Sequence, residues 1–191
     1  MKDAAYIAQY LKETETIAQT IDQGAIAKMV AVLRGIKQAK GRLFILGVGG
    51  SAGNASHAVN DFRKIGGIEC YAPTDNVSEL TARINDISWA DCFSGWLEVS
   101  QLRAGDGLLV LSVGGGGPNV SQNLVKAMDM AKAKGAKIAA IVSRDGGYAA
   151  QIGDAAVIVP VVDKDRITPH AEGWQAVVWH MVVNAMVLAE G

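Results

Sequence analysis

The pattern of hydrophobic and polar positions divides the chain into helical and extended segments. Apolar residues recur at helical spacing over residues 4–22 and 24–40, for example at Met29, Leu33 and Ile36. A glycine separates these two segments, and another glycine follows the second. The first 40 residues are therefore predicted to form an N-terminal segment of two amphipathic helices.

Five short apolar runs follow, rich in β-branched and aliphatic residues and alternating with helical patterns. Strands that alternate with helices favour a doubly wound parallel sheet, because parallel neighbours need a crossover connection. The predicted fold class is α/β: one domain over residues 1–191, with a five-stranded parallel sheet flanked by helices. The predicted strands are RLFILG (42–47), IECYA (68–72), GLLVLSV (107–113), KIAAIVS (137–143) and AAVIVPV (155–161), and the helices lie at about 52–64, 90–102, 119–134, near Tyr148 and from about 170.

Composition is consistent with one soluble globular domain. Half of the 191 residues are hydrophobic and the formal net charge is −1, which gives no argument for nucleic acid or an anionic membrane surface as partner. The most apolar long stretch, residues 174–189, is interrupted by Gln175, His180 and Asn184, so it does not fit a membrane span. We expect a buried helix that is covered on several sides, with another subunit as one candidate cover.

The cysteines and the N-terminus indicate a cytoplasmic protein. Cys70 and Cys92 lack a CxxC spacing, so reduced buried thiols are expected, with a single disulfide as the alternative. The N-terminal stretch is amphipathic and has no secretory apolar region.

Two predicted strands end in glycine-rich turns that lead into helices, at residues 47–51 and 112–121. Glycine lets the backbone approach a ligand, and free N–H groups at a helix start favour an anion. Ser51, Ser112 and Ser121 add hydroxyl donors. The pattern predicts a phosphate site that uses no lysine or arginine; the alternative is a pair of ordinary tight turns.

Two other phosphate-binding arrangements fit this sequence less well. In the dinucleotide pattern, Gly47 and Gly49 would be followed by a third glycine after two residues, but Gly53 comes after three. The acidic residue at a suitable distance, Glu69, lies inside a predicted strand. A P-loop is excluded because no Gly-Lys-Ser/Thr follows the glycines.

Candidate acid–base or metal-binding groups lie on two predicted helices. His57 and Asp61 are four residues apart and share a helix face, where a metal ion or an acid–base pair would suit them. Glu172 and His180 supply similar groups, although eight helical residues rise about 12 Å, so they share one centre only if Glu172 bends in or another subunit contributes. Taken singly, each group also fits a solvated or core position.

Two smaller polar features lie in predicted connections. Asn85 and Asp86 precede a helix, where a turn or a helix cap is the simpler interpretation. Thr168 and Pro169 fit the cap and the first turn of the last helix.

Four segments, GVGGSAGNASHAVNDF, ARIND, SVGGGGPNVSQNLVKA and TPHAEGWQAVVWH, resemble the sugar isomerase (SIS) domain family in its phosphoheptose (sedoheptulose-7-phosphate) isomerase branch, and the resemblance runs from about residue 3 to 190. It implies a flavodoxin-like doubly wound fold and a homotetramer with active sites at subunit interfaces. It also implies isomerisation of sedoheptulose 7-phosphate to D-glycero-D-manno-heptose 7-phosphate through an enediol, in surface polysaccharide biosynthesis, with zinc as the metal. The alternatives are a non-catalytic phosphosugar-binding or protein-interaction module, and an isomerase of another ketose phosphate.

The resemblance assigns roles residue by residue. Asp61 and His180 would be catalytic, with Asp61 as the base and His180 as the acid. The implied metal ligands are His57, Asp61, Glu172 and His180; the implied substrate-binding residues are Val48, Gly49, Gly50, Ser51, Asn85, Asp86, Ser112, Val113, Gly114, Ser121 and Glu172.

This chain departs from the family pattern in four places. Val48 replaces an asparagine, Asp61 a glutamate and Glu172 a glutamine, while the loop at 112–121 is longer, richer in glycine and poorer by two hydroxyls. Three carboxylates at one site, with Asp86 as the third, would raise one another's pKa unless a cation neutralises them. The sequence therefore favours a bound divalent metal.

Overall fold

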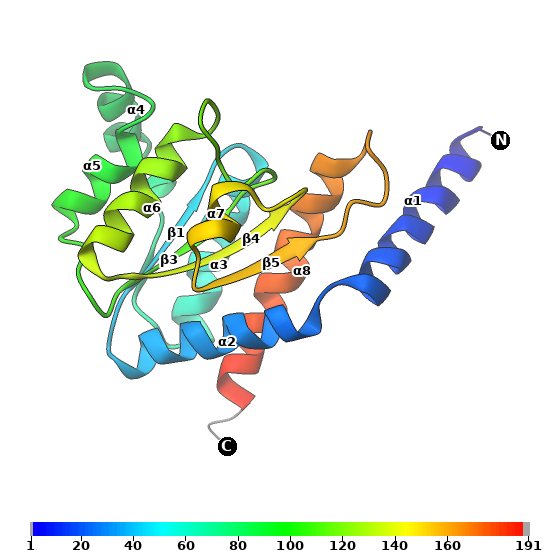
Figure 1. Cartoon of the computed structure of the whole chain (residues 1–191), viewed down its shortest axis with the longest axis horizontal. Helices are drawn as coiled ribbons and strands as arrows, with labels where there is room; N and C mark the ends of the chain where they lie inside the picture. The colour runs from blue at the N-terminus through cyan, green and yellow to red at the C-terminus, as the bar shows by residue number, and fades with distance from the viewer. Residues whose placement is uncertain (1, 189–191) are drawn as a thin grey trace.

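The computed structural model describes residues 2–188, and these form an α/β fold around one sheet (Figure 1). All five strands are parallel, in the order β2-β1-β3-β4-β5. The predicted fold class is confirmed; β4 has the predicted bounds, and the other four strands are shorter than the sequence runs indicated. The strands are β1 (Leu43–Gly47), β2 (Cys70–Tyr71), β3 (Gly107–Leu111), β4 (Lys137–Ser143) and β5 (Ala155–Val159).

Helices cover both faces of the sheet, with α2, α3 and α8 on one side and α5, α6 and α7 on the other (Figure 1). Along β1, Leu43 and Ile45 pack into the first core, whereas Phe44 and Leu46 pack into the second. Because successive strand residues point to opposite faces, a sheet covered on both sides needs continuous apolar strands. The helices are α1 (Lys2–Thr20), α2 (Gln23–Gln38), α3 (Gly50–Lys64), α4 (Val77–Asp86), α5 (Cys92–Val99), α6 (Gln122–Lys134), α7 (Gly147–Ile152) and α8 (Ile167–Leu188), with a 3-10 turn at Pro73–Asp75.

Two helices differ from the sequence prediction. Helix α4 lies in a connection that was predicted to be irregular, with Leu80 and Ile84 packed against the second core. Helix α8 begins at Ile167, so Thr168 lies inside the helix and the prediction that it caps this helix was wrong. Helical geometry already begins at Ile167, one residue before Thr168. The Thr168 side chain lines a cavity instead of capping the helix.

The last helix is buried along most of its length, as predicted for residues 174–188; Ala189 lies outside the described residues. Trp179 is fully buried, but Val177 and Met181 on the same helix remain 43% and 41% exposed. No helix within residues 2–188 is long and apolar enough to cross a membrane. A strip of α8 is thus left uncovered in the isolated chain.

Helix α1 extends away from the sheet and is attached near the start of α8 (Figure 1). Glu13 is 4% exposed and accepts hydrogen bonds from Arg166, while its second carboxylate oxygen lies 2.8 Å from Nε2 of His170. The Arg166 guanidinium, followed by His170 and Gln9, holds the pKa of the Glu13 carboxyl well below its usual range. This network fixes α1 against the first turn of α8.

Both cysteines are free and buried, which confirms the expectation of reduced thiols. Burial raises the pKa of each thiol above its usual value. Neither side chain is therefore suited to act as a thiolate nucleophile.

The strand order places a natural binding crevice between β1 and β3. The chain runs outward from β1 to β2 in one direction and from β3 to β5 in the other, so the connections after β1 and β3 leave on opposite sides of the sheet. Ligands of such sheets bind at this point, beyond the carboxyl ends of the strands. Both glycine-rich turns, at 47–51 and 112–121, follow these two strands.

Candidate active site

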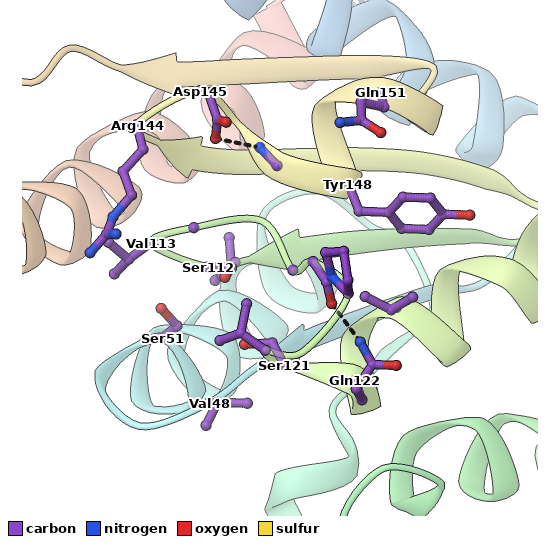
Figure 2. A pocket seen from close by; sticks show the side chains of 18 of the residues that line it. Val48, Ser51, Ser112, Val113, Ser121, Gln122, Arg144, Asp145, Tyr148 and Gln151 are labelled. Carbon is purple, nitrogen blue, oxygen red and sulfur yellow. Dashed lines mark hydrogen bonds between the residues drawn. The ribbon is translucent and has the colours of Figure 1, made fainter.

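A cavity of about 910 Å³ lies beyond the carboxyl ends of β1, β3 and β4 (Figure 2). The two glycine-rich turns and the turn after β4 form its wall, together with the first turns of α6, α7 and α8. Of the predicted substrate-binding residues, Val48, Ser51, Ser112, Val113, Gly114, Ser121 and Glu172 line it; the other lining residues include Gly116, Gly117, Pro118, Val120, Gln122, Asp129, Arg144, Asp145, Gly147, Tyr148, Gln151 and Thr168.

The first glycine turn brings the start of α3 against α8. Gly49 has φ +63° and directly precedes the helix, a conformation that favours glycine. A Cβ atom at Gly50 would lie 2.4 Å from a carboxylate oxygen of Glu172. The absence of a side chain at Gly50 is thus what lets Glu172 reach the cavity beside Ser51, which is 2% exposed.

The second glycine turn presents backbone and hydroxyl groups to the same cavity. The Ser112 hydroxyl oxygen accepts a hydrogen bond from the Gly115 N–H at 3.1 Å, which folds the turn back on itself. Ser121 precedes α6 in a left-handed conformation, with φ +50°, and its side chain makes no capping hydrogen bond. Its hydroxyl group is left to face the cavity.

The turn after β4 is fastened to the second glycine turn through the backbone. The amides of Tyr148 and Ala149 donate to the carbonyls of Gly116 and Gly115, each at 3.0 Å, and the Ser143 amide donates to the Val113 carbonyl at 2.9 Å. The two backbones touch so closely that a Cβ at Gly115 would lie 2.0 Å from the carbonyl oxygen of residue 146. The two turns therefore form one rigid wall.

Sequence reasoning missed the contribution of this third turn. Arg144 follows β4 directly, lines the cavity and adopts φ +56°, so an arginine lies at the cavity for which the sequence analysis predicted phosphate binding without lysine or arginine. The signal was present in the sequence, because Arg144 follows a predicted parallel strand as the two glycine turns do. Beyond it, the hydroxyl of Tyr148 donates to the Asp129 carboxylate, which raises the pKa of Tyr148.

A second group of polar side chains lies farther along α3 and α8. His57, Asp61 and His180 each offer one ligand atom, and these three atoms all lie within 4.8 Å of one another. Nε2 of His180 is 3.5 Å from a carboxylate oxygen of Asp61. The His180 ring stacks on Trp179, with centroids 3.5 Å apart, so the buried indole fixes its plane.

The hydrogen bond at Nδ1 of His180 determines which nitrogen of the neutral ring carries the proton. Nδ1 lies 2.7 Å from the carbonyl oxygen of Ala176, which only accepts, so Nδ1 carries a proton. In the neutral ring, Nε2 therefore presents a lone pair toward the Asp61 carboxylate. Two electron-rich atoms 3.5 Å apart are stabilised by a proton or a cation between them.

The donor set fits a divalent metal ion. Two imidazole nitrogens and one carboxylate oxygen are ligands that zinc accepts, and three protein ligands leave a position for water or substrate. Glu172, the fourth predicted ligand, is not part of the group formed by His57, Asp61 and His180. The carboxylate of Glu172 lies beside Gly50, and the backbone positions of Glu172 and His180 are about 12 Å apart along α8.

The structure keeps several predicted site residues apart. Asn85 and Asp86 occupy the exposed last turn of α4, where the Asn85 amide donates to the Asp86 carboxylate at 2.7 Å, and they do not line the cavity. Within one copy, Asp61, Asp86 and Glu172 lie on three different helices and share neither the cavity nor the group of ligand atoms, so their crowding at one site stays a prediction. The substrate roles of Asn85 and Asp86 stay predictions.

Sequence comparisons with known proteins point to one family. The sequence model described as SIS domain matches residues 5–143. The chain is 34% identical over 173 residues to a phosphoheptose isomerase of Sulfurimonas denitrificans, covering 87% of this chain and 83% of the relative. It is 30% identical over 169 residues to one of Geotalea daltonii, covering 84% and 85%.

Solved structures show the same fold at lower identity. A phosphoheptose isomerase from Neisseria gonorrhoeae superposes with a TM-score of 0.81 at 24% identity, covering 97% of this chain and 96% of that one. One from Francisella tularensis gives the same TM-score and coverage at 20% identity.

Proposed function

Because this chain belongs to the SIS domain family, and its phosphoheptose isomerase relatives match it over most of their length, we propose that it is an aldose–ketose isomerase acting on a sugar phosphate, namely sedoheptulose 7-phosphate. The observation that carries the proposal is the Asp61–His180 pair, 3.5 Å apart and held by Trp179 and Ala176. A binding module without catalysis has no need of such a pair.

The reaction moves one hydrogen between neighbouring carbons. A base removes a proton from C1 of the ketose while the C2 carbonyl oxygen gains one, and this gives an enediol. Return of a proton to C2 and loss of the C1 hydroxyl proton give the aldose, so substrate and product are isomers. We assign the carbon proton to the Asp61 carboxylate and the oxygen proton to Nε2 of His180; because Nδ1 is bonded to the Ala176 carbonyl, Nε2 fills this role only while it does not ligate a metal ion.

The residues His57, Asp61 and His180 would hold a metal ion such as zinc in this enzyme. When bound, the ion polarises the substrate carbonyl and stabilises negative charge on the enediol oxygens. The phosphate end of the substrate would lie at the glycine-rich turns, where hydroxyl and amide donors position the sugar.

The proposed site extends across two copies of the chain. His57, Asp61 and His180 do not line the 910 Å³ cavity of their own copy, and Val177 and Met181 beside His180 are exposed apolar groups. Packing α8 against a second copy would cover this strip and bring the catalytic pair to a neighbouring cavity. The exposed strip at Val177 and Met181 supports the homotetramer with interface sites that the family resemblance implies.

We expect the protein to convert sedoheptulose 7-phosphate, with a chelator lowering the rate and zinc restoring it. Product NMR after incubation with sedoheptulose 7-phosphate and a panel of ketose phosphates, with and without chelator, measures this directly. Conversion of a different ketose phosphate alone would show that the substrate is that sugar and not sedoheptulose 7-phosphate. Conversion of none would favour a non-catalytic phosphosugar-binding module.

Mixing two inactive variants tests the interface. Asp61→Asn removes the catalytic carboxylate, and Gly115→Ala disrupts the cavity wall. If each site combines parts of two copies, co-refolding equal amounts should restore about one quarter of the wild-type rate, because one site in four draws both intact parts. A mixture that stays inactive would place the cavity and the catalytic pair of each site in the same copy.

A further inference from the structure

Arg144 is the one basic side chain among the residues that line the cavity, and it is exposed. Within residues 2–188 its guanidinium forms no hydrogen bond or salt bridge. Figure 2 shows the side chain extending toward Val113, on the side of the cavity where Ser51 and Ser112 lie. A lone arginine there is a cation without a protein partner, next to hydroxyl donors.

The backbone holds Arg144 in an unfavourable conformation. A non-glycine residue at φ +56° costs roughly 1 kcal/mol relative to its usual conformations. The turn that carries Arg144 is anchored on both sides, by the Ser143 amide on Val113 and the Tyr148 amide on Gly116. Its Cα position is therefore fixed relative to the glycine turn, and the strain is retained by the surrounding structure.

The acidic side chains that line the cavity contact other groups than Arg144. Asp129 accepts from the Tyr148 hydroxyl, Asp145 accepts from the Gly147 amide at 3.1 Å, and the Glu172 carboxylate lies against Gly50. None of them neutralises Arg144. The positive charge is available for a ligand from outside the chain.

We propose that Arg144 binds the anionic phosphate group of the substrate and so determines specificity for phosphorylated over neutral sugars. The glycine turn at this site supplies backbone amides but few hydroxyls, since Val113 and Gly114 carry none. A guanidinium supplies two parallel donors and a full charge for a phosphate. The identity of the sugar rests on the proposed isomerase function, whereas the anion site does not.

The test compares Arg144→Gln with Arg103→Gln, a change of an exposed arginine outside the cavity. In Arg144→Gln we expect KM for the sugar phosphate to rise about 10- to 100-fold with kcat little changed, because a charged hydrogen bond to the non-reacting end is lost. Arg103→Gln should leave both constants unchanged. Arg144→Lys should recover part of the loss.

Inorganic phosphate separates this proposal from the isomerase function. Its binding, followed by calorimetry on the wild type and each variant, needs no turnover. Weaker phosphate binding in Arg144→Gln, with the Arg103→Gln control intact, supports the anion site even if no sugar phosphate is converted. Equal phosphate affinity in the wild type and Arg144→Gln, or no phosphate binding to the wild type at millimolar concentration, would overturn it.

A third variant checks that lost binding does not reflect lost folding. Glycine adopts φ +56° without strain, so Arg144→Gly should melt no lower than the wild type while binding phosphate as weakly as Arg144→Gln. A large drop in Tm on this substitution would instead assign Arg144 a structural role and contradict the proposal.

Discussion

Replacing Asp61 with asparagine should lower kcat/KM for sedoheptulose 7-phosphate by about 1000-fold, the scale of a lost general base. Asparagine keeps the shape of the side chain but cannot take a proton from carbon. Asp61 is 9% exposed, so bulk water has little access to replace it. His180→Gln should cause a loss of similar size, because the amide cannot cycle a proton at the position of Nε2.

Three measurements separate catalysis from folding and from metal binding. Circular dichroism and size-exclusion chromatography should show a folded protein of unchanged size for both variants, and elemental analysis at saturating zinc measures how much of the loss comes from weaker metal binding, since both residues belong to the proposed ligand group. The matched control is Glu98→Gln, which changes an exposed acid on α5 away from the site. If Asp61→Asn turned over within tenfold of the wild type, Asp61 would not be the base.

Gly115→Ala should be the most damaging single change in the cavity wall. The new Cβ would lie 2.0 Å from a backbone carbonyl oxygen at residue 146, at a position with φ +72°. Both the clash and the left-handed conformation oppose alanine, so we expect a loss of about 3 kcal/mol and a Tm lower by about 6–12 °C. Phosphate binding should fall with it, because the two turns can no longer stay in contact.

The control for this change lies next to it in the chain. A Cβ at Gly114 would have no atom within 4 Å, so Gly114→Ala should leave the Tm unchanged. Thermal unfolding of both variants side by side compares the same chemical substitution at two adjacent positions. Equal Tm values would show that the contact between the two turns does not stabilise the fold.

The three central strands β1, β3 and β4 could be predicted because they are buried on both faces and end at or just before glycine or serine. Helix α4 was missed because only Leu80 and Ile84 mark its inner face, and both are half-buried. Spacing along one helix was enough to pair His57 with Asp61, which the structure confirms.

Site residues whose position depends on the course of the backbone in space are harder to predict from spacing along one helix. That Arg144 follows a strand was visible in the sequence, but its φ of +56° and its place on the cavity wall were not. The separation of Glu172 from His180, by contrast, was indicated by their spacing, and it agrees with α8 being one continuous helix. Asp86 is the last residue of α4 and lies outside the cavity of its own copy. The polar sequence of this region did not define where the helix ends.

In the glycine-rich turn at 112–121, the position that fixes the backbone shape differs from the positions that are free to contact a ligand. Gly115 has no room for a side chain because the backbone at residue 146 lies against it. Gly114 and Gly117 both have room for a Cβ atom, and Val113 already carries a side chain. A library of substitutions restricted to Val113, Gly114 and Gly117 could therefore vary ligand preference on an unchanged backbone. Threonine at 113 with serine at 114 would add two hydroxyls facing the ligand, and would make the turn a starting point for engineered sugar selectivity.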